Sequence, residues 1–336
     1  MAGSGFGTNF RITTWGETHG AGVGVVVDGC PAGLPLERED VQKYLDRRKP
    51  GQSKYTTQRK EGDQVEILSG IFEGRTTGTP ISMVVYNKDQ RSKDYSNIKD
   101  IYRPGHADFT FDMKYGFRDY RGGGRSSGRE TIGRVAAGAV AAKVLKELGI
   151  EIKAYAKAIA GIEVSKDHFD FAEMNNNPFN MPDKEAAKLV QEKADQMIKE
   201  MDSIGGIIEC QITGMPVGIG ETVFDKLDAE LSKAIMSIGS VKGFEIGDGF
   251  EAANLRGSEN NDDFICVDGK VEKETNHSGG VLGGMSDGSA IVFRAAIKPT
   301  PSIAQTQKTV NRDLDNVEIE IHGRHDPMIV PRAVVV

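Results

Sequence analysis

The segment from Arg121 to Glu130 constrains this chain most, because it joins three consecutive glycines to a long alanine-rich stretch. Glycines let the backbone turn tightly and approach another group closely, since they have no Cβ. Ser127 and Glu130 have the S-x-x-E spacing of a capping box, so a helix is predicted over residues 128–149. The segment therefore predicts a tight loop that leads into a helix N-terminus.

Four arginines surround this helix start: Arg121, Arg125, Arg129 and Arg134. Free N–H groups and the helix dipole make such an N-terminus a binding site for phosphate, and arginines strengthen it. The alternative is a solvated, arginine-rich loop in front of a core helix. Glu130 is the one acid near enough in the sequence to pair with these cations, which favours an anion site.

Composition narrows the class of ligand. The chain has 336 residues and a net charge of −7, so the arginines are a local concentration on an acidic background. This favours a small anionic ligand over nucleic acid. Three separated cysteines without a C-x-x-C pair indicate neither a disulfide framework nor a metal site, and fit a reducing cytoplasm. No signal peptide precedes Phe10 and no apolar run could span a bilayer, so we expect a soluble, intracellular protein without membrane contacts.

A repeated turn indicates internal duplication. The sequence G-x-P-x-G-[LI] occurs at residues 29–34 and again at 214–219, each time before a predicted helix, at about 37–48 and 225–238. The second copy follows a predicted strand at 207–212. Two related units of this kind favour one pseudo-symmetric domain over residues 1–336.

The hydrophobic pattern predicts the remaining elements. Residues 87–125 show almost no regular pattern, but their aromatic side chains favour an ordered loop. Residues 250–276 are polar and glycine-containing, as in a surface excursion. The other predictions are two strands within 65–86, strands at 150–164 and 290–297, and an amphipathic helix at 183–201.

Several common enzyme signatures are absent: the sequence contains no Walker loop, no H-E-x-x-H and no G-x-S-x-G. His19 and His106 lie in glycine-flanked turns, where an imidazole can face a ligand or simply be structural. From the residues alone we therefore expect an enzyme that binds a small polyanion and transfers protons.

Taken together, five motifs resemble those of the chorismate synthase family. They are collinear over almost the whole chain: residues 16–20 (GETHG), 28–33 (DGCPAG), 103–108 (RPGHAD), 121–130 (RGGGRSSGRE) and 323–327 (GRHDP). The resemblance implies the 1,4-anti elimination of phosphate from 5-enolpyruvylshikimate 3-phosphate to give chorismate, the last common step of the shikimate pathway to aromatic amino acids. It implies a requirement for reduced FMN, with NADPH as one candidate reductant. It also implies an α+β fold, a β-α-β sandwich with helices between two antiparallel sheets, and a homotetramer.

The resemblance assigns roles residue by residue. His19 would be the general acid toward the departing phosphate, His106 would contact the reduced flavin, and Asp326 would assist flavin N5 in taking the substrate's C6 proton. The residues that would bind substrate are Arg48, Lys54, Arg103, Arg129 and Arg134. Those that would bind FMN are Arg125, Ser126, Ser127, Gly239, Ser240, Gly283, Lys298, Pro299, Thr300, Pro301 and Ser302, and Arg324 would lie between flavin and substrate.

Three departures from the family pattern affect these assignments. Lys54 stands where many relatives have arginine, so a point charge replaces a bidentate donor. Thr18 replaces serine in the first motif and keeps the hydroxyl. The sequence ends at Val336, where relatives usually continue into another helix.

Two other functions use the same features. A lyase or transferase acting on a phosphorylated sugar would need the anion-binding residues but no flavin. An RNA-binding module would use the arginine clusters and the aromatic residues of 87–125. The acidic net charge and the lack of a nucleic-acid motif speak against the second.

Overall fold

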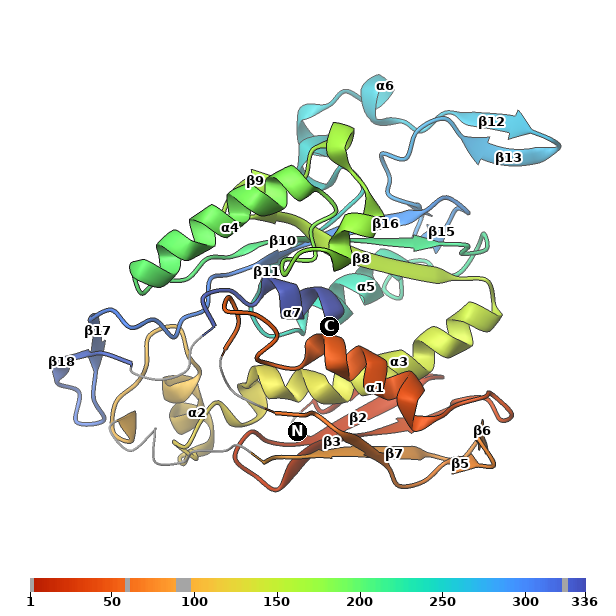
Figure 1. Cartoon of the computed structure of the whole chain (residues 1–336). Coiled ribbons are helices and arrows are strands. Elements are labelled where there is room, and N and C mark those ends of the chain that lie inside the picture. Colours follow the sequence, from red (N-terminus) through yellow and green to blue (C-terminus); the bar gives the residue numbers. More distant parts are fainter. Residues whose placement is uncertain (1–2, 58–60, 89–97, 322–325) are drawn as a thin grey trace. The chain divides into compact units, whose positions relative to one another are not determined.

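The structure is a computed structural model that describes residues 3–57, 61–88, 98–321 and 326–336. Helices and antiparallel sheets make it an α+β fold, as predicted, and Figure 1 labels the elements. The chain divides into two compact units. The first contains residues 1–144, 188–205 and 299–336, and the second contains residues 145–187 and 206–298. Within the described ranges, no helix is both long and apolar enough to cross a membrane.

The first unit is built on a five-stranded sheet in which every neighbouring pair is antiparallel. Its central strand, β3, is rich in valine, and β-branched side chains pack well on a pleated surface. The strands, in spatial order, are β1 (Gly5–Phe6), β2 (Arg11–Gly16), β3 (Gly22–Asp28), β7 (Ile81–Tyr86) and β4 (Val65–Ile67).

Helices α1 (Arg38–Arg48) and α3 (Thr131–Glu147) cover one face of this sheet (Figure 1). Side chains from this face of the sheet, such as Val25 of β3 and Met83 of β7, form one buried cluster with the side chains of the two helices. The small residues of α3 allow close packing: a Cβ on Gly133 would lie 3.1 Å from the carbonyl oxygen of Gly24. Predicted helix 128–149 is thus confirmed, with a 3₁₀ turn over Gly128–Glu130 before the α-helix.

One prediction in the first unit is wrong. The segment expected to be an irregular loop, 87–125, contains α2 (Asp108–Tyr115) within its described part. Its sequence, DFTFDMKY, shows no clear apolar face, so the helical pattern is weak. The helix begins at the buried carboxylate of Asp108, which Arg103 binds. Asp112 of the same helix pairs with Arg312 at 2.8 Å, and this long-range contact is invisible in the local pattern. The first unit also contains β5 (Ile71–Phe72), β6 (Arg75–Thr76), β17 (Gln307–Val310), β18 (Asn316–Ile319) and α7 (Val330–Val335).

The second unit has its own five-stranded antiparallel sheet. Helix α5 (Leu227–Met236) packs on it through leucine and isoleucine side chains, with Ile291 and Phe293 of β16 in the same cluster. The strands, in spatial order, are β11 (Val241–Ile246), β16 (Ile291–Ile297), β10 (Gly206–Thr213), β8 (Glu151–Ile159) and β9 (Ile162–Glu163). Together with α4 (Lys184–Lys199), whose residues belong to both units, they confirm the predicted strands and helices of this region.

The two sheets share one topology. In spatial order, β2-β3-β7-β4 and β8-β10-β16-β11 both run first, second, fourth, third along the chain. In each unit the second strand leads through the G-x-P-x-G turn into a helix, α1 or α5. In each, a small hairpin precedes the last strand: β5–β6 in the first unit, and β14 (Val281–Leu282) with β15 (Met285–Ser286) in the second.

The repeated turn is also braced in the same way twice. The Thr76 hydroxyl donates to the carbonyl of Pro31, and the Ser286 hydroxyl donates to the carbonyl of Pro216, both at 2.6 Å. Each hydroxyl also accepts from the backbone N–H three residues after its proline, at 3.0 and 2.9 Å. Shared topology and shared bracing confirm the internal duplication.

The predicted surface excursion is exposed but not irregular. It contains a 3₁₀ segment (Gly249–Asn254), α6 (Gly257–Asn260) and a hairpin of β12 (Phe264–Val267) and β13 (Lys270–Lys273). At its base, buried Lys273 binds Asp262 at 3.1 Å and Asp287 at 2.7 Å. This ion cluster explains how a polar segment is held in a defined structure.

Candidate active site

His19 lies in a β-turn between β2 and β3. The backbone N–H of Gly20 donates to the carbonyl of Glu17 at 3.3 Å, which puts Thr18 and His19 at the two central positions. The imidazole lies against Gly122 of the glycine-rich loop: a Cβ there would be 2.8 Å from His19 Cδ2. The first and fourth motifs therefore meet, and the glycine lets the backbone approach a catalytic candidate.

The glycine-rich loop turns through a 3₁₀ segment, Gly124–Ser126, before the helix. Ser127 accepts a hydrogen bond from the backbone N–H of Arg129 at 3.3 Å, as predicted for a cap. The Glu130 carboxylate instead contacts Thr14 and Arg134, at 3.2 and 2.9 Å, so the second half of the expected capping box is replaced by tertiary contacts.

Each arginine of the helix start has a protein partner, contrary to the expectation that few acids lie near them. Arg121 pairs with Asp119 at 2.6 Å, and these hydrogen bonds lower the pKa of Asp119. Arg125 donates to Gly16 and Thr14 of β2, Arg129 pairs with Asp63, and Arg134 pairs with Glu130. Asp63 comes from far earlier in the chain, which explains why local sequence could not reveal it.

Asp63 joins two predicted substrate ligands. Its carboxylate binds Arg48 through Oδ2 and Arg129 through Oδ1, the latter at 3.1 Å, and all three side chains are buried. Burial lowers the pKa of Arg48 to about 10, while the charge of Asp63 opposes this, so Arg48 stays a cation at neutral pH. The sequence analysis did not identify Asp63 as part of the site. The available signal was the pair of acids, Glu61 and Asp63, directly after the basic residues of 47–60.

The R-P-G-H-A-D motif forms a second polar centre. Arg103 binds Asp108 through two hydrogen bonds, at 2.7 and 2.8 Å, and both residues are buried. Burial acts to raise the pKa of Asp108, but the hydrogen bonds and charge of Arg103 outweigh it and lower the pKa. His106 Nδ1 lies 2.9 Å from the carbonyl of Pro104, and Nε2 lies 2.9 Å from Oγ of Ser302.

These contacts define which tautomer a neutral His106 adopts. A carbonyl oxygen only accepts, so Nδ1 carries the proton, and a neutral ring accepts from Ser302 at Nε2. Ser302 belongs to the proline-rich loop Lys298–Ser302, so two predicted flavin ligands distant in sequence are brought together. On the same loop, Thr300 Oγ1 is buried and has no hydrogen-bond partner within the described residues, while its carbonyl accepts from Ser203 at 2.7 Å.

Two further site candidates are held by ion pairs in the first unit. The exposed Lys54 pairs with Asp195 of α4 at 2.7 Å, which raises the pKa of Lys54. Asp326 accepts from the backbone of Thr57 at 2.6 Å and pairs with Arg332 at 2.9 Å. Arg324, the expected residue between flavin and substrate, lies outside the described residues.

Three candidates in the second unit, Gly239, Ser240 and Lys298, gather at one strand end. The backbone N–H of Lys298 donates to the carbonyl of Ser240 at 2.9 Å, which joins the Gly239–Ser240 turn to the end of β16. Ser240 has a left-handed backbone, with φ of 74°. Gly283 lies apart from this turn in sequence, at the tip of the β14–β15 hairpin.

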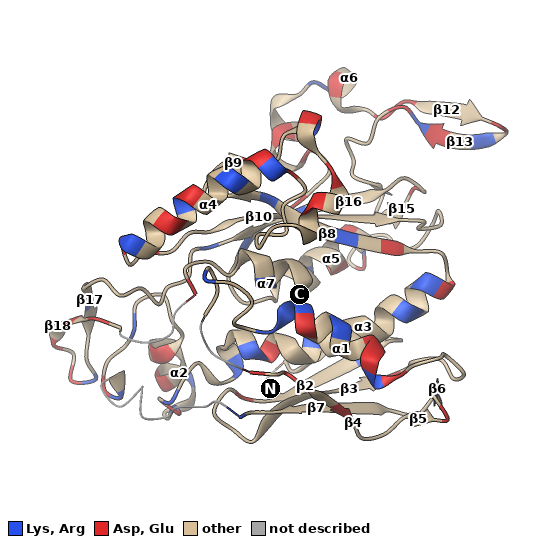
Figure 2. Cartoon of the chain, viewed as in Figure 1, with Lys and Arg blue, Asp and Glu red and all other residues tan. Residues whose placement is uncertain are grey.

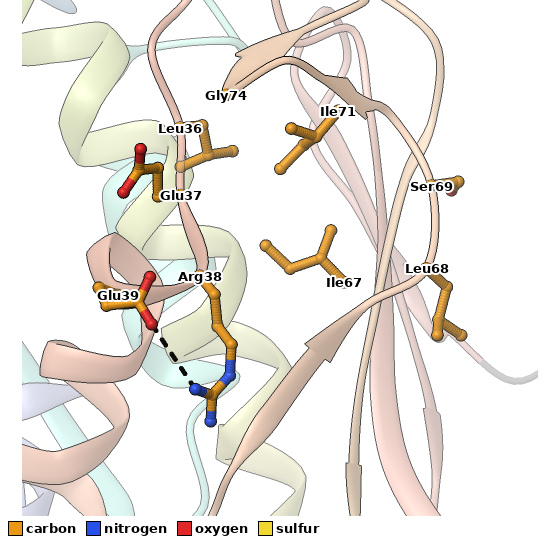
Figure 3. A pocket seen from close by; sticks show the side chains of 9 residues that line it. All are labelled: Leu36, Glu37, Arg38, Glu39, Ile67, Leu68, Ser69, Ile71 and Gly74. Atoms are coloured by element: carbon orange, nitrogen blue, oxygen red, sulfur yellow. Dashed lines mark ion pairs between the residues drawn. The ribbon is translucent and has the colours of Figure 1, made fainter.

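The pocket in Figure 3 is not made by these residues. It has a volume of about 520 Å³ and lies between the start of α1 and the β4–β5 segment. Leu36, Ile67 and Ile71 supply its apolar lining, and Arg38 and Glu39 form an ion pair at 3.6 Å on its rim. None of its lining residues belongs to a predicted catalytic or binding set.

Neither the charge distribution nor the arrangement of possible metal ligands indicates another kind of site. Figure 2 shows basic residues interspersed with acidic ones along α1 and α4, which does not resemble the basic stripe of a nucleic-acid-binding face. Among the residues that the structure describes, no group of three or more His, Cys, Asp or Glu side chains is arranged to hold a metal ion.

Comparison with known proteins shows the family. The family model for chorismate synthase matches residues 10–336. The chain belongs to the chorismate synthase family. It is 70% identical to the chorismate synthase of Lachnospira eligens and 66% identical to that of Agathobacter rectalis, in both cases over 100% of this chain and 92% of the relative. It is 57% identical to the chorismate synthase of Methanosarcina mazei, over 100% of this chain and 93% of the relative.

A crystal structure of chorismate synthase has the same fold, with a TM-score of 0.78 and 30% identity over 98% of this chain and 88% of that one. The chain is therefore a carbon–oxygen lyase acting on a phosphate, and its reaction converts 5-enolpyruvylshikimate 3-phosphate to chorismate. Chorismate synthases make the precursor of aromatic amino acids, so this chain belongs to aromatic biosynthesis.

Proposed function

We propose that the chain performs this elimination with His19 as the general acid, arginines as substrate ligands and reduced FMN as the cofactor. The observation that carries the proposal is the contact of the His19 turn with the glycine-rich loop. That contact places an imidazole beside the segment whose arginines would hold the substrate anions.

The substrate carries a phosphate and two carboxylates, so its binding requires several cations. Arg48 and Arg129 share Asp63, and Arg129 also lies 3.9 Å from the buried carboxylate of Glu61, so these acids fix both guanidinium groups in place. The Nε of Arg48 is buried and finds no acceptor in the described part of the chain, so it is a donor still available to a ligand. Arg103, Arg134 and Lys54 would complete the set.

When the C–O bond breaks, the bonding electrons leave with the phosphate, and its negative charge grows. His19 would donate a proton from its imidazole to a phosphate oxygen, and the arginines would stabilise the remaining charge. Asp326, whose carboxylate is held by Thr57 and Arg332, would assist transfer of the C6 proton to flavin N5.

The residues of the first unit fit a flavin. His106 and Ser302 supply a polar pair for the edge of an isoalloxazine ring, and the buried hydroxyl of Thr300 is a further group suited to a ligand. By family resemblance, Arg125, Ser126 and Ser127 would contact FMN at the helix start. The same resemblance assigns FMN contacts to Gly239, Ser240, Gly283 and Lys298. Reduced FMN would supply transient electron density that starts phosphate departure.

The decisive experiment is anaerobic turnover. The purified chain is incubated with 5-enolpyruvylshikimate 3-phosphate and FMN reduced by dithionite, and chorismate is measured by chromatography. We expect chorismate only when reduced FMN is present. Absence of chorismate under these conditions would refute the proposal, whereas equal turnover without flavin would favour a flavin-independent lyase. Replacing dithionite by NADPH tests whether the chain reduces its own FMN.

The flavin assignment has a spectroscopic test of its own. His106→Ala should shift the absorbance spectrum of bound reduced FMN or its pH dependence, because the proposed partner of His106 is the flavin ring. FMN should also bind more tightly when substrate is present, because bound substrate closes the anion-binding site. An unchanged spectrum in the variant would remove His106 from the flavin site.

The proposal extends to assembly and location. By family resemblance we propose a homotetramer of one domain over residues 1–336; light scattering should give four times the chain mass of 36.4 kDa. We also propose a cytoplasmic location, supported by the three cysteines, which are all free.

A further inference from the structure

Asn87, the residue after β7, holds the turn that carries His19. Its side-chain Nδ2 donates to the carbonyl of Glu17 at 2.9 Å and to the carbonyl of Gly20 at 2.8 Å. Its backbone N–H donates to the carbonyl of Ala21 at 3.0 Å. One residue therefore binds both ends of the turn, and so fixes the backbone from which the imidazole of His19 projects.

The same amide also binds a predicted substrate ligand. Oδ1 of Asn87 accepts from Nε of Arg129 at 2.9 Å, while Nη1 of Arg129 donates to Asp63 at 3.1 Å. Two of the three guanidinium nitrogens of Arg129 thus donate to fixed acceptors. Only a side-chain amide offers two donors and an acceptor in one planar group, so neither Asp nor Ser can reproduce these three bonds.

We propose that Asn87 is a positioning residue that sets His19 relative to Arg129. This inference rests on the proposed function, in which His19 protonates the phosphate that Arg129 helps to hold. Proton transfer depends steeply on the distance and angle between donor and acceptor, and a displacement of about 1 Å can cost roughly 10²-fold in rate. The Asn87 amide, hydrogen-bonded to both the His19 turn and Arg129, keeps that geometry as substrate binds and product leaves.

The chain offers a matched control in Asn177. Its Nδ2 also donates to two backbone carbonyls, those of Glu173 at 2.7 Å and Met181 at 2.8 Å, in a loop of the second unit. This asparagine is purely a loop brace, without a catalytic candidate on the loop. Asn177→Ala therefore measures what the loss of such bonds costs the fold alone.

A double-mutant cycle separates positioning from a structural role. Asn87→Ala, His19→Ala and the double variant are compared under anaerobic turnover conditions. If Asn87 acts through His19, Asn87→Ala should lower kcat by roughly 10- to 100-fold in the parent, but by less than about 3-fold once His19 is alanine. Asn177→Ala should leave kcat at the parent value.

A second measurement does not depend on turnover. In protein labelled with [13Cε1]histidine, Asn87→Ala should shift or broaden the signal assigned to His19 by comparison with His19→Ala, and Asn177→Ala should not. Asn87→Asp, which keeps the acceptor for Arg129 but loses the two donors, should alter the His19 signal in the same way and serves if the alanine variant does not fold.

The proposal is overturned if kcat losses in the cycle simply multiply, or if the His19 signal is unchanged in both Asn87 variants. If the parent makes no chorismate at all, the proposed function is wrong, and the histidine signal alone then decides whether Asn87 positions His19. The two failures are thus distinguishable.

Discussion

Asp63 is the acid on which two buried arginines depend, so Asp63→Asn is the sharpest test of how the site is held together. The side chains of Arg48, Arg129 and Asp63 are respectively 1%, 5% and 0% exposed. Asparagine keeps the shape and one acceptor but removes the charge. Arg48 would then remain buried without its carboxylate partner, and Arg129 would keep the longer contact with Glu61, at 3.9 Å. Breaking a buried pair in this way costs about 3–5 kcal/mol.

The assay is urea denaturation of the parent and of each variant at equal protein concentration, monitored by far-ultraviolet circular dichroism. A matched control is Asp28→Asn, because Asp28 pairs with Arg11 at 3.3 Å on the surface, where the two side chains are 48% and 59% exposed. An exposed pair contributes about 0–1 kcal/mol. If Asp63→Asn lowers the free energy of unfolding no more than Asp28→Asn, the buried cluster does not stabilise this unit as argued.

Three further predictions follow from named contacts. His19→Ala should lower kcat by about 10²–10⁴-fold, as for loss of a general acid, while the FMN dissociation constant changes far less; parent-like turnover would exclude this role. Lys54→Arg should keep or improve the Michaelis constant for substrate, since arginine is bidentate, and a clear rise would contradict a substrate role at this position. In the second unit, burial acts to raise the pKa of Asp262 and Asp287, but their hydrogen bonds outweigh it and lower both. Carboxylates with lowered pKa contribute stability that is present above about pH 4 and is lost as the pH falls further. Lys273→Met should therefore destabilise the parent at pH 7 by about 3–5 kcal/mol and make stability less sensitive to acid; parallel pH profiles in urea denaturation would refute this.

Much of the secondary structure could be read from local pattern, because periodicity and capping act over a few residues. The helices near residues 38–48, 131–147 and 227–236 follow from such signals. So does the duplication, since the same turn recurs with the same chemistry. Helix α2 could not be predicted, because its pattern is weak and Asp112 within it finds its partner, Arg312, only in the folded chain.

The sequence by itself determined the candidates for the chemistry: the glycine-rich loop, its arginines and the two histidines in turns. Only the tertiary structure decided their partners. The pairing of Arg48 and Arg129 with Asp63, the contact of Gly122 with His19 and the bonds of Asn87 all join residues far apart in the chain. Local sequence carries no record of such contacts, because they form only when the sheet and α3 pack and bring these loops together.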